Sequence, residues 1–478
     1  MFTKTRRAKA PPLKRDELLY SNRSLVNIIV PLLLTQLLSI LVSTVDTVMV
    51  SFAGEVAVSG VSLVASLDTL LMMFFTSMIA GGAVVLTQTL GRGSYADVYE
   101  VAKQLLYICT LIATVLAVVV SIFSKPLLYG LFGEAEDAIM QSAKNYFFFI
   151  ALSYPFVAIQ DAAGACFRAS GDTRTHFFVS LAVNMVNVCF NAFFIYKMGM
   201  GAAGAALATL IARGCGAVIL FVLILGKKHE IHLERILHYR PNFIIIKQIM
   251  GIGVPNGIEN AMFQFGRVVT QSLISSLGTT AIAANAIAFN ICNFQYLVGA
   301  AFSTTIVTVV GFCLGSREQR QAKYYARRLI GFEYAVLWVV IGLSCICINP
   351  LLSLYNLSGA SAALAKQLVF YHAVFAAAIW PIGFTLPSAF RAAGDVRYPM
   401  VVSMATMWIF RVVGAYFCAL ESVSVFGLFT VLGLGLGIAG VWFAMTVDWL
   451  IRAVLFFIHF IKGKWALRKS VAVEGAVK

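Results

Sequence analysis

Long apolar stretches recur along the whole chain, and they restrict its fold more than any other feature. The sequence is 60% hydrophobic and only 12% charged over 478 residues, whereas soluble globular proteins carry roughly twice that share of charge. An apolar helix of about 18 residues or more spans a bilayer of ~30 Å. We identify twelve such spans: 25–50, 61–89, 104–124, 145–166, 175–196, 203–226, 249–276, 282–312, 329–349, 367–390, 399–418 and 434–461. They predict an all-α polytopic membrane protein.

The two halves of the chain repeat each other in the same order. The phrase from Phe167 to Arg174 returns from Phe390 to Arg397 with six of its eight positions identical, and Pro31 in the first span returns as Pro255 in the seventh. Six spans bring the chain back to the side where it started, so both halves enter from the same side. Two six-helix lobes related by a pseudo-two-fold axis along the membrane normal are therefore predicted. The expected segments are a tail over 1–24, lobes over 25–226 and 249–461, a linker over 227–248 and a tail over 462–478.

Basic residues concentrate on one side of the predicted topology. Of the 36 Lys and Arg residues, 28 lie in the tails and the even-numbered loops. The odd-numbered loops carry only Lys125, Lys144, Lys197 and Lys366. By the positive-inside rule, both termini are cytoplasmic and the protein is a multi-pass component of the cytoplasmic membrane. The net charge of +15 is then a topology signal, which argues against nucleic acid as a partner.

The doubled phrase falls in two predicted cytoplasmic loops. Gly171 and Gly394 allow a tight turn, and Asp172 and Asp395 are predicted to cap the helix that follows each turn. The arginines beside them are expected to pair with the aspartates or to meet lipid phosphate. A substrate gate is the alternative function, and we favour the structural turn.

The sequence points to neither an enzyme nor a resident metal or cofactor. It has no HExxH motif and no G-x-S-x-G motif with a histidine partner. The nine cysteines lie in or beside apolar spans without a CxxC pair, as small buried side chains do. His229, His232 and His238 in the linker leave a metal cluster open, but an interfacial amphipathic stretch is the preferred interpretation.

Polar residues inside apolar spans are the main candidates for function, because a charged side chain at mid-bilayer costs at least ~2.5–3.5 kcal/mol. Gln36 and Asp46 share one face of the first span. Asp46 is suited to take up and release a proton, or to hold Na⁺ or an organic cation. In the fifth span, Asn184, Asn187 and Asn191 share a face, and their carboxamides coordinate cations or bridge helices. We predict these five as cation-coupling residues, with plain helix-packing roles as the alternative.

A second set of polar residues is predicted to line a cavity between the lobes. We expect Glu259 to pair with Arg267, directly or through Gln264, and Arg411 to have a carboxylate or carbonyl partner. The complete set of cavity candidates is Glu259, Asn260, Gln264, Arg267, Asn293, Arg411, Asp68 and Asp161.

At these positions the chain resembles the multidrug and toxic compound extrusion (MATE) transporters, over roughly residues 20–460. The motifs that carry the resemblance occur in the family's order, and two of them occur twice. They are the Val45-Asp46-Thr47-Val48-Met49 segment, the Leu90-Gly91 and Leu314-Gly315 pairs, the two copies of the doubled phrase, and the Trp408-Ile409-Phe410-Arg411 segment.

The resemblance implies a cation-coupled antiporter that expels organic cations or amphipathic drugs as two six-helix lobes rock. It places the coupling carboxylate at Asp46 and implies no cofactor beyond a gradient of H⁺ or Na⁺, and we expect a monomer. Three positions depart from the family pattern. Asn191 stands where many bacterial members have Asp, and Phe263 and Trp380 stand where the sodium-coupled branch has acidic residues. We therefore favour protons over sodium, with a transported Na⁺ at Asp46 left open.

The alternative function is a lipid-linked oligosaccharide or lipid flippase of the same superfamily. Such flippases tend to have a basic cavity and additional C-terminal helices. Here twelve spans are predicted, and the buried acids match or outnumber the buried arginines. Small-molecule export is therefore the preferred interpretation.

Overall fold

The computed structural model describes residues 17–133, 136–233, 240–353, 355, 358–425, 429–468 and 470–471. Within this part of the chain, eleven helical segments are long and apolar enough to cross a membrane. Helix α7 (Phe243–Ser276), the seventh crossing in chain order, brings the number of crossings to twelve. Its 34 residues span about 51 Å at 1.5 Å per residue, but its charged and amide side chains lower its hydropathy. The prediction of twelve membrane helices in an all-α fold is confirmed.

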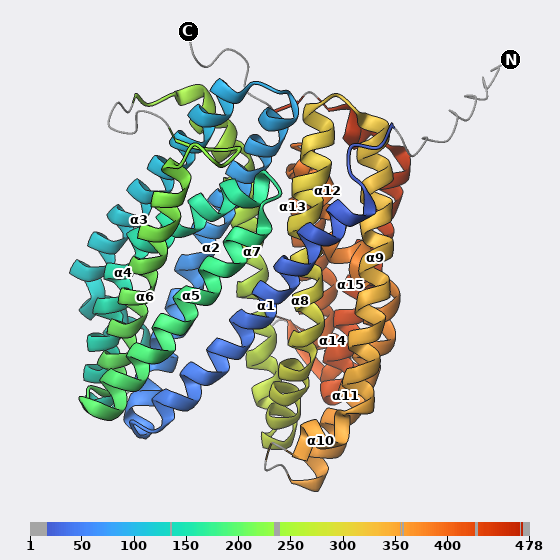
Figure 1. Cartoon of the computed structure of the whole chain (residues 1–478). Helices are drawn as coiled ribbons and strands as arrows, with labels where there is room; N and C mark the ends of the chain where they lie inside the picture. Colours follow the sequence, from blue (N-terminus) through green and yellow to red (C-terminus); the bar gives the residue numbers. More distant parts are fainter. Residues whose placement is uncertain are drawn as a thin grey trace, which may run out of the picture.

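The N-terminal lobe contains the first six crossings, coloured blue to green in Figure 1. Its fifth crossing ends in a short π-helix, η2 (Phe193–Lys197). The helices of this lobe are α1 (Asn22–Ser51), α2 (Glu55–Gly91), α3 (Tyr95–Phe132), α4 (Asp137–Ala169), α5 (Thr173–Ala192) and α6 (Gly201–Leu225).

The C-terminal lobe starts with α7 and is less regular, because π-helices interrupt two of its crossings. η3 (Pro381–Thr385) joins α11 to α12, and η4 (Met407–Val413) joins α13 to α14. A short antiparallel hairpin, β1 (Ser422–Val425) with β2 (Phe429–Leu432), precedes the last crossing and was not predicted. The other helices are α8 (Thr279–Gly315), α9 (Gln319–Ile346), α10 (Ile348–Ser353), α11 (Gly359–Trp380), α12 (Pro387–Ala392), α13 (Arg397–Thr406), α14 (Gly414–Ala419) and α15 (Gly437–Lys462).

The backbone confirms that the two lobes are copies of one design. Gly54 and Gly278, which precede α2 and α8, both have φ of 95°. Gly171 and Gly394, in the two copies of the doubled phrase, have φ of 83° and 74°. These angles strain any residue with a Cβ, so glycine is needed at the same turn in each lobe.

The lobes exchange the first turns of their leading helices. Leu25 and Ile28 of α1 pack into the buried core of the C-terminal lobe. Ile245 and Ile249 of α7 pack into the core of the N-terminal lobe. Residues 33–48 of α1, by contrast, include no fully buried side chain. The lobes are thus joined at the end that carries both termini and diverge towards the other end (Figure 1).

Two glycines bring the lobes into backbone contact at the joined end. A Cβ on Gly91 of α2 would lie closer than 3.0 Å to the Phe312 carbonyl oxygen of α8. A Cβ on Gly315 of α8 would meet the Gln88 carbonyl oxygen equally closely. Ser316 donates its hydroxyl to the Gly91 carbonyl oxygen at 2.7 Å. The Leu-Gly pairs that end α2 and α8 therefore allow the two helices to touch.

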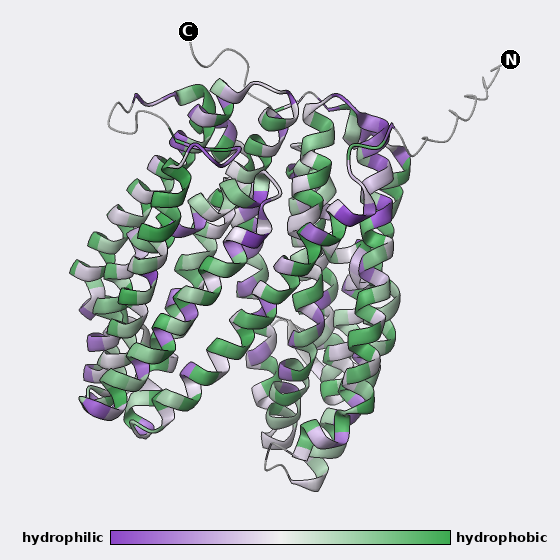
Figure 2. Cartoon of the chain, in the orientation of Figure 1, coloured by the Kyte–Doolittle hydropathy of each residue, from purple (hydrophilic) through white to green (hydrophobic). Residues whose placement is uncertain are grey.

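Both chain ends also cross onto the opposite lobe at the joined end. The Tyr20 amide, ahead of α1, donates to the Tyr325 hydroxyl of α9 at 2.7 Å. Gln88 of α2 accepts a hydrogen bond from the Val471 amide at 2.8 Å and donates to the Ala392 carbonyl at 2.6 Å. Hydrophilic residues gather at this end, while the bundle below is largely hydrophobic (Figure 2).

The two copies of the doubled phrase differ in what their aspartates do. Asp172 accepts a hydrogen bond from the Thr175 amide at 3.2 Å and caps α5, as predicted. The cap predicted for Asp395 is wrong. Its carboxylate lies 2.9 Å from His459 Nε2 and 3.3 Å from the Arg468 guanidinium, because the last turn of α15 and the segment that follows it both lie against this turn.

Candidate functional site

A hydrogen-bonded chain of polar residues joins three helices of the N-terminal lobe around Asp46. The Asn191 amide of α5 donates to Asp46 Oδ1 of α1 at 2.8 Å and to Asn187 Oδ1 at 3.1 Å. Asn187 in turn donates to the Thr209 hydroxyl of α6 at 3.3 Å. Asn187 and Asn191 are buried, and Asp46 is half-buried. The spacing of four residues in α5 places the two carboxamides on one helical face, where they support the carboxyl group.

Asp46 has an amide partner but no basic one. Within the described chain, no Lys or Arg forms an ion pair with it, and Asn191 Oδ1 is a buried oxygen without a hydrogen-bond donor. A carboxyl group in this setting has its negative charge uncompensated by protein cations. The carboxyl group of Asp46 is therefore able to exchange a proton or a small cation when a movement of the lobe changes how exposed this group is.

Two of the five predicted coupling residues lie outside this hydrogen-bonded chain. Asn184 donates back to the Ser180 carbonyl of its own helix at 2.8 Å. Gln36 is half-buried about 15 Å along α1 from Asp46, given the rise of 1.5 Å per residue. Thr209 is the participant that the sequence analysis missed. A hydroxyl in an apolar helix gives only a weak sequence signal.

A pocket of 370 Å³ opens in the C-terminal lobe between α7, α8 and η4. The Arg267 guanidinium lies 5.6 Å from the centre of the Phe289 ring, and the Arg411 guanidinium lies 5.4 Å from that of Phe263. These contacts hold the positive groups over aromatic faces. Four predicted cavity residues line the pocket: Gln264, Arg267, Asn293 and Arg411.

The lining of this pocket is amide-rich and basic. It includes Gln271, Asn285 and Asn290 besides the four predicted residues, and it includes no carboxylate. Asn285 donates to Gln271 at 3.3 Å and accepts from the Trp442 indole at 3.0 Å, so the pocket wall is fixed by hydrogen bonds. We call this space the C-lobe pocket.

Comparison with known sequences decides the family. The sequence model of the MatE family matches residues 31–193 and 255–417, one match in each lobe. The chain belongs to the MatE family. The second match begins and ends 224 residues after the first, so each half of the internal repeat contains one copy of the family unit.

Several curated proteins resemble this MATE transporter over nearly their whole length. The "Probable multidrug resistance protein NorM" of Thermotoga maritima is 25% identical over 468 residues, which cover 97% of each chain. The "Uncharacterized transporter YisQ" of Bacillus subtilis is 23% identical and covers 94% of this chain and 96% of its own.

Solved structures share the fold at low sequence identity. An "outward-facing conformation of a multidrug resistance MATE family transporter" superposes with a TM-score of 0.84 at 16% identity, covering 94% of this chain and 97% of that chain. A transporter from Pyrococcus furiosus, reported with the words "reverse polarity of binding pocket suggests different function", gives a TM-score of 0.82 at 16% identity and the same coverage.

The other predicted acids of the N-terminal lobe are compensated by arginines in this MATE transporter. Asp68 Oδ2 lies 3.9 Å from Arg213, which also donates to the Ser153 hydroxyl at 2.7 Å. Asp161 interacts electrostatically with Arg168 and Arg213. These groups form a basic-acidic cluster beside the Asp46 chain, and Asp46 alone among the three lacks an arginine.

The pairing predicted for Glu259 is wrong. Its Oε1 lies 2.9 Å from the guanidinium of Arg391, the arginine of the second doubled phrase, and not near Arg267. The end of α12 reaches the buried face of α7, whereas Arg267 points into the C-lobe pocket. Asn260 crosses to the other lobe and donates to the Ser77 hydroxyl at 3.1 Å. Glu259 and Asn260 therefore belong to the joined end and not to the pocket.

The expected carboxylate or carbonyl partner of Arg411 is also absent from the described chain. The nearby Asp448 forms its ion pair with Arg452 at 3.1 Å instead. These two residues are four apart on α15, so one helical face brings them together. Arg411 is left with a longer-range electrostatic attraction to Asp448, an aromatic contact with Phe263 and the pocket.

Glu333 is a buried acid that the sequence analysis missed. It is fully buried in α9 and accepts a hydrogen bond from the Thr385 hydroxyl of η3 at 2.6 Å. A single carboxylate inside the apolar span 329–349 is the same signal that identified Asp46, so the sequence did contain it.

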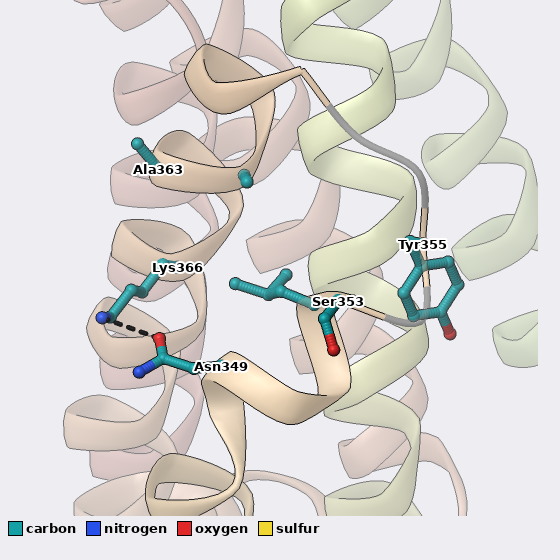
Figure 3. Close-up of a pocket in the computed structure, with 7 residues that line it drawn as sticks. Asn349, Ser353, Tyr355, Ala363 and Lys366 are labelled. Carbon is teal, nitrogen blue, oxygen red and sulfur yellow. Dashed lines mark hydrogen bonds between the residues drawn. The ribbon is translucent and has the colours of Figure 1, made fainter.

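Two further pockets lie near the end of the molecule away from the termini. One, of 440 Å³, lies between α10 and α11, where Lys366 donates to Asn349 at 3.0 Å (Figure 3). The other, of 560 Å³, is lined by Lys125 and Lys144. Neither contains a predicted site residue.

Two of the three linker histidines, His229 and His232, lie in the part of the chain that the structure describes. Among the described residues, no group of three or more His, Cys, Asp or Glu is placed to hold a metal ion. His229 lies 3.7 Å from Asp172, and the ring of His232 packs 4.3 Å from that of Tyr99. His238 lies outside the described residues.

Proposed function

We propose that this protein exports amphipathic, drug-like molecules from the cell in exchange for protons. Export would proceed by alternating access between the lobes over 25–226 and 249–461, with both termini in the cytoplasm. Several relatives are named as probable multidrug resistance proteins, including those of Thermotoga maritima and Neisseria meningitidis, which supports drug-like substrates.

The observation that carries the proposal is the Asp46 chain. Asp46 is a membrane carboxyl group with a polar network behind it and no basic partner in the described chain. Uptake of a proton removes its charge, which lowers the cost of enclosing it in an apolar environment. Proton binding and the conformation of the N-terminal lobe are thereby linked, as coupled antiport requires.

The composition of the network favours a proton over Na⁺. Asp46 is its only carboxylate, because its partner on α5 is the amide of Asn191 and not a second acid. A sodium site would also need several oxygen ligands, and the network offers one carboxylate and few free oxygens.

The way in which the lobes meet is suited to alternating access. Their contacts at the joined end rest on the glycine contacts of α2 and α8 and on the exchanged first turns of α1 and α7. If the termini are cytoplasmic, the conformation in which the lobes touch at the joined end is closed to the cytoplasm. Rocking the lobes about the middle of α2 and α8 would expose Asp46 to the other side.

The test is efflux from reconstituted vesicles under pH and Na⁺ gradients imposed separately. Asp46→Asn is expected to abolish gradient-driven transport while the protein stays folded, because asparagine cannot exchange a proton. Asp137→Asn, at an exposed position in the first turn of α4, is the matched control and should behave like wild type. Gradient-driven efflux at the wild-type rate from Asp46→Asn would refute the assignment, and efflux driven only by Na⁺ would refute proton coupling.

A further inference from the structure

The lining of the C-lobe pocket carries two positive groups and no negative one. Arg411 is only 6% exposed, and its Nε atom has no hydrogen-bond partner in the described chain. Arg267 of α7 lines the same pocket. Neither guanidinium forms an ion pair with a described carboxylate. A buried arginine without an anion is costly, so such a group normally has a partner or a ligand.

The acids of the surrounding helices are already engaged elsewhere. Asp448 pairs with Arg452 at 3.1 Å, and Glu259 pairs with Arg391 at 2.9 Å. The third acid is Glu333 of α9, which accepts the Thr385 hydroxyl. Asp448 also attracts Arg411 electrostatically, but the same carboxylate forms its ion pair with Arg452. Three arginines, Arg267, Arg411 and Arg452, therefore share one carboxylate, and the region of the pocket keeps a net positive charge.

The internal repeat shows that this pocket is the C-lobe counterpart of the Asp46 site. Under the shift of 224 residues that relates the two family matches, Asp46 corresponds to Thr270, which lines the pocket. Under the same shift Ser43, one turn before Asp46 on α1, corresponds to Arg267. One duplicated location thus has a negative group in the first lobe and a positive group in the second.

We propose that the C-lobe pocket binds an oxyanion, such as a carboxylate or sulfonate, on an amphipathic substrate. Arg267 and Arg411 would hold the oxyanion, since a guanidinium group binds two oxygens of one oxyanion through paired hydrogen bonds. Amide donors such as Asn293 add polar contacts, and Val268 and Ile274 offer apolar surface to the body of the substrate.

The inference rests on the proposed export function and specifies its substrate class. The resemblance implied organic cations or amphipathic drugs as substrates. Of these, the pocket favours amphipathic drugs that carry a negative charge. Its volume of 370 Å³ suits a drug-sized molecule rather than a lipid-linked oligosaccharide. The two lobes then separate the charges, with the coupling proton in one lobe and the anionic substrate in the other.

The test compares two dyes that share a xanthene ring system and differ in charge. Carboxyfluorescein is the anion and a rhodamine ester is the cation. Vesicles of zwitterionic lipid with an acidic lumen contain the full-length protein, and dye content is measured after filtration and lysis in one buffer. Carboxyfluorescein is expected to accumulate at least 10-fold faster than in protein-free vesicles and faster than the rhodamine.

Arg267→Gln is expected to reduce carboxyfluorescein uptake about 10- to 100-fold, because a hydrogen bond to a charged group is worth about 1.5–3 kcal/mol. Arg411→Lys retains the charge in the buried position and should keep part of the uptake. Arg23→Gln, at an exposed position in the first turn of α1, is the matched control and should have no effect.

Transport of the rhodamine without carboxyfluorescein would overturn the inference while leaving the proposed function intact. Carboxyfluorescein uptake that is unchanged in Arg267→Gln would also overturn it. Scrambling of a labelled anionic lipid without dye uptake would assign the oxyanion site to lipid head groups and refute a small-molecule substrate. A different result would refute the proposed function and not the oxyanion site. In that case carboxyfluorescein would bind to the purified protein in an Arg267-dependent way, but no pH gradient would drive its uptake.

Discussion

A single methyl group at Gly91 should open the joined end of the molecule. Gly91→Ala places a Cβ closer than 3.0 Å to the Phe312 carbonyl oxygen of the opposite lobe. Both groups belong to helix backbones, so no side-chain rotation relieves the clash. The helices α2 and α8 must separate, and the hydrogen bond of 2.7 Å from Ser316 to the Gly91 carbonyl then lengthens.

The size of the effect follows from these contacts. Overpacking in a tight contact costs about 1–3 kcal/mol, and loss of the Ser316 hydrogen bond adds about 0.5–1.5 kcal/mol. The closed form therefore loses about 1.5–4.5 kcal/mol relative to a form that is open at the joined end. Because each 1.4 kcal/mol is a factor of ten, the equilibrium shifts about 10- to 1,600-fold.

Hydrogen–deuterium exchange in lipid nanodiscs measures this shift without labelling any of the nine native cysteines. The amides of residues 312–318 at the end of α8 should exchange faster by a similar factor, since local opening controls their exchange. Gly331→Ala is the control, because this helical glycine of α9 has open space around its Cβ position. It should leave exchange at 312–318 unchanged and should not destabilise α9. Exchange in Gly91→Ala within twofold of wild type would refute the reasoning.

Three further predictions follow from other contacts. Asn191→Leu removes the amide donor to Asp46, and we expect proton-driven efflux to fall about 10-fold in the vesicle assay. Unchanged efflux would show that the hydrogen bonds around Asp46 do not contribute to proton coupling. Thr385→Val leaves the buried carboxyl of Glu333 without its hydroxyl partner and should lower the free energy of unfolding by about 1–3 kcal/mol in a thermal melt. An unaltered melting curve would contradict a stabilising hydrogen bond between Thr385 and Glu333. Gln88→Leu removes the acceptor of the Ser470 hydroxyl and the Val471 amide, and the Val471 amide should lose its protection from exchange. Persisting protection of that amide would refute the role of Gln88.

The sequence predicted the architecture well because its signals are local and repeated. Apolar runs determine where helices cross a membrane, and the doubled phrase shows that the second half copies the first. Gly171 and Gly394 have similar positive φ angles, as two copies of one turn require. Asp46 was identifiable because a carboxylate is rare in an apolar span, and Glu333 could have been found by the same criterion.

Side-chain partners were much less predictable. Arg391 is 132 residues from Glu259 in the chain, and Asp395 contacts a histidine 64 residues away. Helical periodicity places a residue on a face, but it does not reveal which other helix packs against that face. The pairing predicted for Glu259 was wrong because Arg267 was the nearest basic residue in sequence, while α12 is the helix that approaches in space.

The sequence by itself determined that this protein has twelve membrane helices in two like halves, and which polar residues lie inside them. Those properties depend on hydropathy and repetition, which are written residue by residue. Only the tertiary structure decided that Asn191 supports Asp46, and that two arginines of the second lobe share a pocket without a carboxylate. Charge compensation depends on distances between helices that are remote in the chain, so the balance of charge in each lobe emerges only when the helices pack.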